Sequence, residues 1–232
     1  MPLRVGFDMD GVIADFSSAF RATEVRLFGP TSPMKPDLPE DEAALEERST
    51  PPPSSALPRL LEQRRRREAI WDVIHKTPDF WTSLEPLDRT AVPRIHELML
   101  RHGWEVFFIT QRPATAGQTV QRQTQHWLRA QGFDLPSVLV ISGSRGAAAG
   151  ALRLNYHVDD NVQNCVDVAA ESPARPILIV PQRDDVTEGG AKRLRIKVAR
   201  SIGEALDILE RVPAAGADST LFGRLSKLVG WD

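Results

Sequence analysis

The chain alternates between short, unbroken apolar runs and longer segments in which apolar residues recur at helical spacing. The apolar runs lie at residues 5–7, 106–109, 138–141, 156–158 and 177–180. Such runs are typical of strands that are buried on both faces of a parallel sheet. Helical patterns lie between or after them, at residues 88–102, 114–131, 161–171 and 201–211. This order predicts an α/β fold with a doubly wound parallel sheet.

Residues 16–83 interrupt the alternation. They contain two helical patterns, at 16–28 and 56–76, which are joined by a stretch rich in proline and acidic residues. Proline excludes a regular strand or a long helix from that stretch, so we expect a mobile or extended connection. The sequence thus predicts a Rossmann-like core, a small helical cap inserted after the first strand, and a helical tail. The core comprises residues 1–15 and 84–212, the cap with its proline-rich insert 16–83, and the tail 213–232.

Composition limits the class of protein. The 232 residues are 41% hydrophobic and 26% charged, which is ordinary for a protein with a buried core, and the net charge is -2. No global field therefore favours nucleic acid or an anionic membrane. No apolar stretch approaches the ~20 residues of a membrane helix. We expect a cytoplasmic protein that forms no membrane contact, with its tail docked on the core; a homodimer contact is the alternative for the tail.

The single cysteine, Cys165, excludes an internal disulfide framework and suits a reducing compartment. It lies in the helical pattern at 161–171. We interpret it as a buried small hydrophobic residue and not as a nucleophile.

Two acidic residues follow the first apolar run directly. Asp8 and Asp10 are two positions apart, so on an extended strand their side chains would face the same pocket. Like charges this close repel each other unless a cation or a shared proton relieves them. The pair therefore predicts a metal site.

Polar residues also follow the other predicted strands. Because ligands of open parallel sheets bind at the carboxyl ends of the strands, we expect these residues to converge. They are Thr110-Gln111-Arg112 after the second strand, Ser142 to Arg145 after the third, and Asp159-Asp160-Asn161 after the fourth. A site rich in oxygen ligands suits Mg²⁺, which also binds substrate phosphate. Carboxylates, a hydroxyl and fixed cations around such an ion can perform phosphoryl transfer.

The ordered set of motifs resembles the haloacid dehalogenase superfamily of phosphohydrolases. The segment Asp8-x-Asp10-Gly11-Val12 is similar to its first motif, Phe108-Ile109-Thr110 to its second, and Asp159-Asp160 to its fourth. Arg145 stands where the third motif has Lys or Arg. Two further stretches, at 10–16 and 80–87, resemble the 5'(3')-deoxyribonucleotidases. That resemblance implies a helical cap after the first motif, with Phe16 and Trp81 as aromatic walls of a nucleobase pocket.

The resemblance implies distinct roles for these residues. Asp8 would attack phosphorus to form an aspartyl-phosphate, and Asp10 would carry the proton for the leaving group and for water. Mg²⁺ would be held by Asp8, the Asp10 backbone carbonyl and Asp159, with Asp160 close by. Thr110 and the backbone amides after Asp8, Gly11 among them, would bind phosphoryl oxygens, while Arg145 would neutralise charge.

Some positions depart from the nucleotidase pattern and leave the substrate open. The nucleotidases usually have lysine where this chain has Arg145, and Gln111-Arg112-Pro113 is closer to phosphatases of polynucleotide ends. Gln111 and Arg112 are candidates for substrate binding, although a surface ion pair is an equal reading for Arg112. The leading prediction is a Mg²⁺-dependent phosphomonoesterase that acts on a nucleotide. The alternatives are a phosphatase of nucleic-acid ends or sugar phosphates, and a non-catalytic relative that binds nucleotides or a protein.

Overall fold

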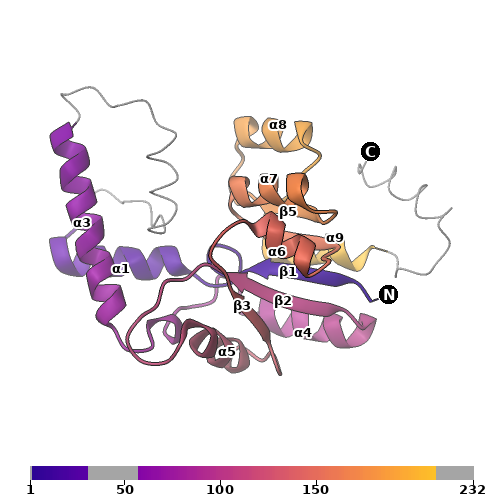
Figure 1. Cartoon of the computed structure of the whole chain (residues 1–232), viewed down its shortest axis with the longest axis horizontal. Coiled ribbons are helices and arrows are strands. Elements are labelled where there is room, and N and C mark those ends of the chain that lie inside the picture. The colour runs from indigo at the N-terminus through magenta and orange to yellow at the C-terminus, as the bar shows by residue number, and fades with distance from the viewer. Residues whose placement is uncertain (1, 31–56, 213–232) are drawn as a thin grey trace.

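The structure is a computed structural model that describes residues 2–30 and 57–212. The tail and almost all of the proline-rich connection lie outside the described residues. Within them, one parallel sheet runs in the order β3-β2-β1-β4-β5-β6 (Figure 1). The strands are β1 Arg4–Asp8, β2 Glu105–Thr110, β3 Ser137–Val140, β4 Tyr156–Asp159, β5 Arg175–Ile179 and β6 Lys197–Ala199. This arrangement confirms the predicted α/β doubly wound sheet.

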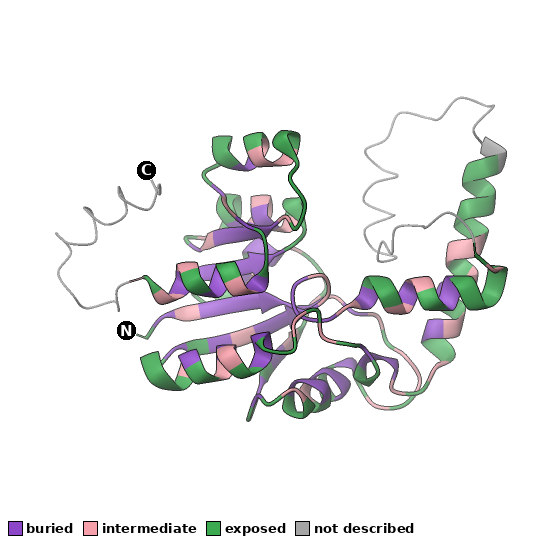
Figure 2. Cartoon of the chain, turned by 180° about the vertical axis from the view of Figure 1, so that it is seen from behind, coloured by how far each residue is buried: buried purple, intermediate pink, exposed green. Residues whose placement is uncertain are grey.

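Among the described residues, three helices cover each face of the sheet. On one face, α4 (Ala91–His102), α5 (Val120–Ala130) and α9 (Ile202–Glu210) share the main core with β1, β2, β4 and β5. The opposite face is covered by α6 (Arg145–Ala151), α7 (Val162–Glu171) and α8 (Asp185–Arg193). The central strands are therefore largely buried on both sides, as their unbroken apolar runs predict (Figure 2).

The strand order positions the functional edge. β1 pairs with β2 on one side and with β4 on the other, so the chain winds outward in both directions from β1. In a sheet of this order, ligands bind outside the carboxyl ends of the strands at that reversal. The last residues of β1, β2 and β4 therefore define where a site is expected.

Two helices of the predicted cap lie beyond the carboxyl ends of the strands (Figure 1, left). They are α1 (Phe16–Phe28) and α3 (Leu57–Lys76), which match the predicted helices at 16–28 and 56–76 and pack against each other. The carboxylate of Asp15 caps α1 by accepting the Ser18 amide at 2.9 Å. A short 3₁₀ turn, η1 (Phe80–Thr82), leads back to the sheet and packs on α5.

Four elements differ from the sequence-based expectation. Helix α5 begins at Val120 and not at 114, because Thr119 caps it and Gly117, at φ 94°, belongs to a preceding loop. Helices α6 and α8 and strand β6 were not predicted, since they are short and lack a clear apolar period. Among the described residues, no helix combines the length and apolar content needed to cross a bilayer.

Candidate active site

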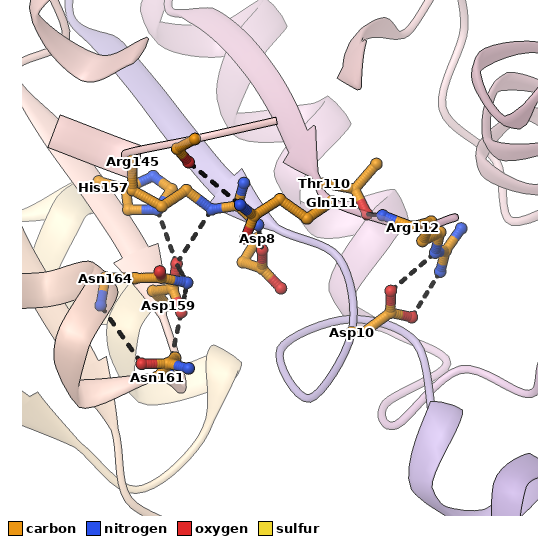
Figure 3. Close-up of polar contacts among 11 residues, drawn as sticks. Asp8, Asp10, Thr110, Gln111, Arg112, Arg145, His157, Asp159, Asn161 and Asn164 are labelled. Atoms are coloured by element: carbon orange, nitrogen blue, oxygen red, sulfur yellow. Dashed lines mark hydrogen bonds and ion pairs between the residues drawn. The ribbon is translucent and has the colours of Figure 1, made fainter. Parts of the chain in front are cut away.

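Three predicted site residues occupy the last positions of neighbouring strands. Asp8 ends β1, Thr110 ends β2 and Asp159 ends β4. Arg145 is the first residue of α6, which follows β3. Figure 3 shows the carboxylates of Asp8 and Asp159 and the guanidinium of Arg145 directed toward one another. The structure therefore brings together residues that are up to 151 positions apart in the chain.

Arg145 bridges two of the carboxylates. Its Nη2 donates to Asp8 Oδ1 at 2.5 Å, and its Nε lies 3.6 Å from Asp159 Oδ2. Burial alone would lower the pKa of Arg145, but the charges of Asp8 and Asp159 outweigh burial and raise it. Arg145 Nε and Nη1 are buried without a hydrogen-bond partner, so the guanidinium retains donors for a further anionic group.

Local packing explains why Arg145 reaches this position. Ser144 caps α6 by accepting the amides of Gly146 and Ala147 at 3.0 and 3.3 Å. A Cβ atom at Gly146 would lie 2.2 Å from the Asp167 carbonyl oxygen of α7. The glycine therefore permits the close approach of α6 to α7 that directs Arg145 toward the strand ends.

Asp159 is surrounded by donors. His157 Nε2 lies 2.9 Å from its Oδ2, the Asn161 amide donates to its Oδ1 at 2.9 Å, and Asn164 Nδ2 lies within 3.2 Å of both oxygens. Burial raises the pKa of Asp159, but the hydrogen bond and charge of His157, the charge of Arg145 and the Asn161 amide together lower it below its ordinary value. Asp159 is thus built to remain charged.

Asp8 has the opposite environment. Burial, and then the negative charge of Asp159, raise its pKa well above the ordinary value, and the charge of Arg145 compensates only in part. Desolvation and the charge of Asp159 likewise raise the pKa of Asp160, to about 7. Both shifts are those that a bound cation would reverse.

These three acids fit a divalent cation. One oxygen each from Asp8, Asp159 and Asp160 can lie within 4.8 Å of one another. Hard oxygen ligands in this number suit Mg²⁺. A Cβ atom at Gly11 would lie 2.0 Å from Asp160 Oδ2, and its φ of 81° is rare for other residues. Glycine at this position therefore makes room for the third carboxylate.

Asp10 does not join the acidic cluster through its side chain. Its carboxylate instead receives Arg112 Nε at 2.8 Å and Arg112 Nη2 at 2.7 Å (Figure 3). The Arg112 side chain is 0% exposed, so it is neither the surface ion pair nor the accessible substrate contact that the sequence suggested. A carboxylate two residues after Asp8 is thus held apart from the carboxylates that could bind a cation.

The two neighbouring polar residues of the β2 end are also engaged. Thr110 is buried, and its Oγ1 accepts the Arg112 amide at 3.3 Å. Gln111 is partly exposed, and its side-chain amide donates to the Gly143 carbonyl at 3.1 Å, which links the loops after β2 and β3. Both therefore lie at the edge where the sequence placed them.

Phe16 and Trp81, predicted to wall a nucleobase pocket, lie in an aromatic cluster formed by α1, α3 and η1. Their rings are 5.4 Å apart, and both side chains are buried together with Phe20, Trp71 and Phe80. The Trp81 indole nitrogen donates to the Pro113 carbonyl at 3.0 Å. In this arrangement neither ring face is open to a base, so their positions do not support that role.

Sequence reasoning did not assign two side chains that matter to the site. Asn164 contacts Asp159 from the first turn of α7, and Thr124 contacts Arg112 from α5. Helical spacing offers one signal for Asn164, because the cap residue Asn161 lies three positions before it. His157 is also fully buried, with its ring against Asp159.

We expect Cys165 to be inert toward thiol reagents in the folded protein. Its side chain is fully buried, and burial together with the charge of Asp159 raises the pKa of its thiol well above the ordinary value. Labelling with iodoacetamide at pH 8 should modify the unfolded chain within minutes and leave the folded chain unmodified, as mass spectrometry would detect. Rapid labelling of the folded chain would contradict a purely packed role.

Comparison with known proteins adds the identity of the fold. No protein-family model and no curated protein sequence matches this chain. Among solved structures, it is similar to a haloacid dehalogenase-like family hydrolase from Streptococcus pneumoniae, with a TM-score of 0.53, 11% identity, and coverage of 90% of this chain and 98% of the other.

Two more structures are similar over comparable lengths. A candidate β-phosphoglucomutase from Thermotoga maritima gives a TM-score of 0.51 at 18% identity, covering 91% of this chain and 100% of the other. An L-2-haloacid dehalogenase from Xanthobacter autotrophicus, with chloropropionic acid covalently bound, gives 0.53 at 14% identity, with coverage of 92% and 100%. This chain therefore has the Rossmann-like fold of the haloacid dehalogenase-like hydrolases.

Proposed function

We propose that the protein is a Mg²⁺-dependent phosphomonoester hydrolase that works through an aspartyl-phosphate on Asp8. The observation that carries the proposal is the division of acids at the strand ends. Asp8, Asp159 and Asp160 form one cluster suited to a cation, while Asp10 is held separately by Arg112. Phosphoester hydrolysis needs both parts, because it requires charge neutralisation and a separate proton carrier.

The residues at the β1 end divide the reaction into two steps. In the first, an Asp8 oxygen attacks phosphorus, the bond from phosphorus to the leaving oxygen breaks, and Asp10 gives that oxygen a proton. In the second, water attacks phosphorus, Asp10 takes the proton of the water, and the bond to Asp8 breaks. Free phosphate and the original Asp8 carboxylate result.

The remaining groups would stabilise charge. The unpartnered Nη1 donor of Arg145 would bind phosphoryl oxygens, together with Thr110 and the backbone amides after Asp8. Asp8, Asp159 and Asp160 would hold the cation. When bound, it neutralises phosphate charge and relieves the repulsion among the three acids.

Displacement of halide from a haloacid is the competing reaction of this fold. One similar structure is an L-2-haloacid dehalogenase, in which chloropropionic acid is covalently bound to the protein. A halide leaves without a proton and without a cation, however. The departure of halide therefore needs neither an acid beside the leaving group nor a cluster of three acids suited to a cation, and the presence of both favours the phosphoester.

A nucleotide is the substrate that we propose first. The support for this substrate is the resemblance of residues 10–16 and 80–87 to the deoxyribonucleotidases. Base stacking on Phe16 and Trp81 adds no support, because both side chains are buried. A panel of 5'- and 3'-nucleotides, sugar phosphates and 3'-phosphorylated oligonucleotides would separate this class from the alternatives. Preferential release of phosphate from oligonucleotide ends or sugar phosphates would reject the nucleotide.

The first experiment is phosphate release from p-nitrophenyl phosphate with Mg²⁺ and with EDTA. We expect turnover with Mg²⁺ and a loss of at least ~10²-fold with EDTA, because a cation contributes several kcal/mol of charge stabilisation. Halide release from 2-chloropropionate is assayed in parallel. Halide release without phosphate release would replace the proposal by a dehalogenase, and binding of nucleotide without either activity would replace it by a binding protein.

A further inference from the structure

All three guanidinium nitrogens of Arg112, the buried arginine that follows β2, donate to protein side chains. Two of its nitrogens form the fork to Asp10, and Nη1 donates to Thr124 Oγ1 at 3.1 Å. The Asp10 side chain, in contrast, remains 16% exposed. A fork occupies one lone pair on each carboxylate oxygen and leaves the others available. Arg112 therefore fixes the Asp10 carboxylate, while the remaining lone pairs of that carboxylate stay available to a substrate or to water.

The guanidinium is itself braced by the cap. Its Cζ lies 4.8 Å from the centre of the Trp81 ring, which is fully buried. The Trp81 indole donates to the Pro113 carbonyl, and the Trp81 amide donates to Gln123 Oε1 of α5 at 3.0 Å. Trp81 of η1 is thus hydrogen-bonded both to the loop that carries Arg112 and to α5. A planar fork on such a support has little freedom to move.

We propose that Arg112 is a positioning residue that holds the Asp10 carboxylate in the orientation for proton transfer. This inference rests on the proposed function, because it assigns Asp10 the proton that the leaving group and the water exchange. Arg112 would not touch the substrate. Its contribution would be orientation, for which a displacement of about 1 Å can cost ~10²-fold in rate.

The proposal predicts an effect that depends on the reaction step. p-Nitrophenolate leaves without a proton, so the attack of Asp8 on p-nitrophenyl phosphate would survive in Arg112→Gln. Hydrolysis of the aspartyl-phosphate would be slow, because the water still needs Asp10. Stopped-flow absorbance should therefore show a burst of about one nitrophenolate per enzyme, followed by turnover reduced ~10²-fold. KM should fall with turnover and kcat/KM should change little, because formation of the aspartyl-phosphate is unaffected.

Two comparisons separate positioning from general damage. Arg94→Gln is the matched control, because Arg94 pairs with Asp207 at 2.5 Å between α4 and α9, away from the site. It should turn over like the wild type without a new burst. In Asp10→Asn/Arg112→Gln the second change should add less than threefold, since no carboxylate remains to be positioned. Arg112→Lys, which keeps the charge without the fork, should recover only part of the rate.

The positioning role of Arg112 and the proposed phosphoester hydrolysis can fail separately. A wild type that releases no phosphate from any ester overturns both. An active wild type overturns only the inference if Arg112→Gln turns over normally, or if the double variant loses the product of the two single losses. A burst amplitude that falls with the folded fraction, as measured by thermal melting, would also reject the positioning role of Arg112. If Arg112→Gln does not fold, the same tests apply to Arg112→Lys.

Discussion

Replacement of Asp8 by Asn should abolish turnover and raise the stability of the cation-free protein. Turnover should fall on the order of 10⁴ to 10⁶-fold, because an amide oxygen is a poor nucleophile and no other carboxylate stands at the end of β1. The fold should survive, since Asn has the same shape. Stability should increase because burial and the charge of Asp159 already disfavour the Asp8 charge and raise its pKa.

The sign of the pH dependence follows from that raised pKa. In the unfolded chain Asp8 ionises near 3.9, whereas in the folded chain it holds its proton to higher pH. Its contribution to stability is complete below 3.9 and is lost as pH rises through the raised pKa. Melting temperatures in EDTA should therefore favour Asp8→Asn increasingly from pH 4 upward, and Mg²⁺ should stabilise the variant less than the wild type.

A control substitution makes the same chemical change elsewhere. Asp185 is exposed on α8 and pairs with the exposed Arg183, so Asp185→Asn should alter neither turnover nor melting temperature appreciably. Normal phosphate release by Asp8→Asn would reject Asp8 as the nucleophile. A lower melting temperature in EDTA at every pH would reject the repulsion that we assign to the acidic cluster.

The central strands could be predicted because a strand that is buried on both faces has an uninterrupted run of apolar residues. Residues 5–7 and 106–109 are apolar without interruption, and they form most of β1 and of β2. Helix α6 has no such apolar pattern. Its sequence from Arg145 is mostly Gly and Ala, and its place is set by the Ser144 cap and by the contact of Gly146 with α7. Tertiary contacts of this kind cannot be read from periodicity.

The candidate site divides in the same way. Asp8 and Asp159 could be predicted as neighbours because β1 and β4 pair in parallel, which brings their last residues together. The fork between Arg112 and Asp10 could not, because it depends on the course of a loop and on the rotamers of both side chains. The burial of Trp81 could not be predicted from the sequence either, because aromatic residues occur both in pocket walls and in the core.

Replacement of Arg145 by Met should cause the largest loss of stability among the site substitutions. Arg145 is 3% exposed and supplies positive charge to both Asp8 and Asp159. Removing one partner of a buried ionic group leaves charge uncompensated and costs roughly 3–5 kcal/mol of unfolding free energy. The cost should grow with pH, because a proton on Asp8 offsets the missing guanidinium at low pH and not at high pH.

Mg²⁺ provides the critical comparison for this substitution. Because a bound cation supplies positive charge to the same carboxylates, it should restore part of the stability lost in Arg145→Met and raise its melting temperature more than that of the wild type. Arg145→Lys should lie between the two proteins in EDTA, since it keeps the charge and loses the bridge between Asp8 and Asp159. Urea unfolding in EDTA and in Mg²⁺ measures both effects. Equal stability of Arg145→Met and wild type in EDTA would mean that the guanidinium does not compensate the acids, and that the cluster must be held together by Asn164, His157 and the strand ends alone.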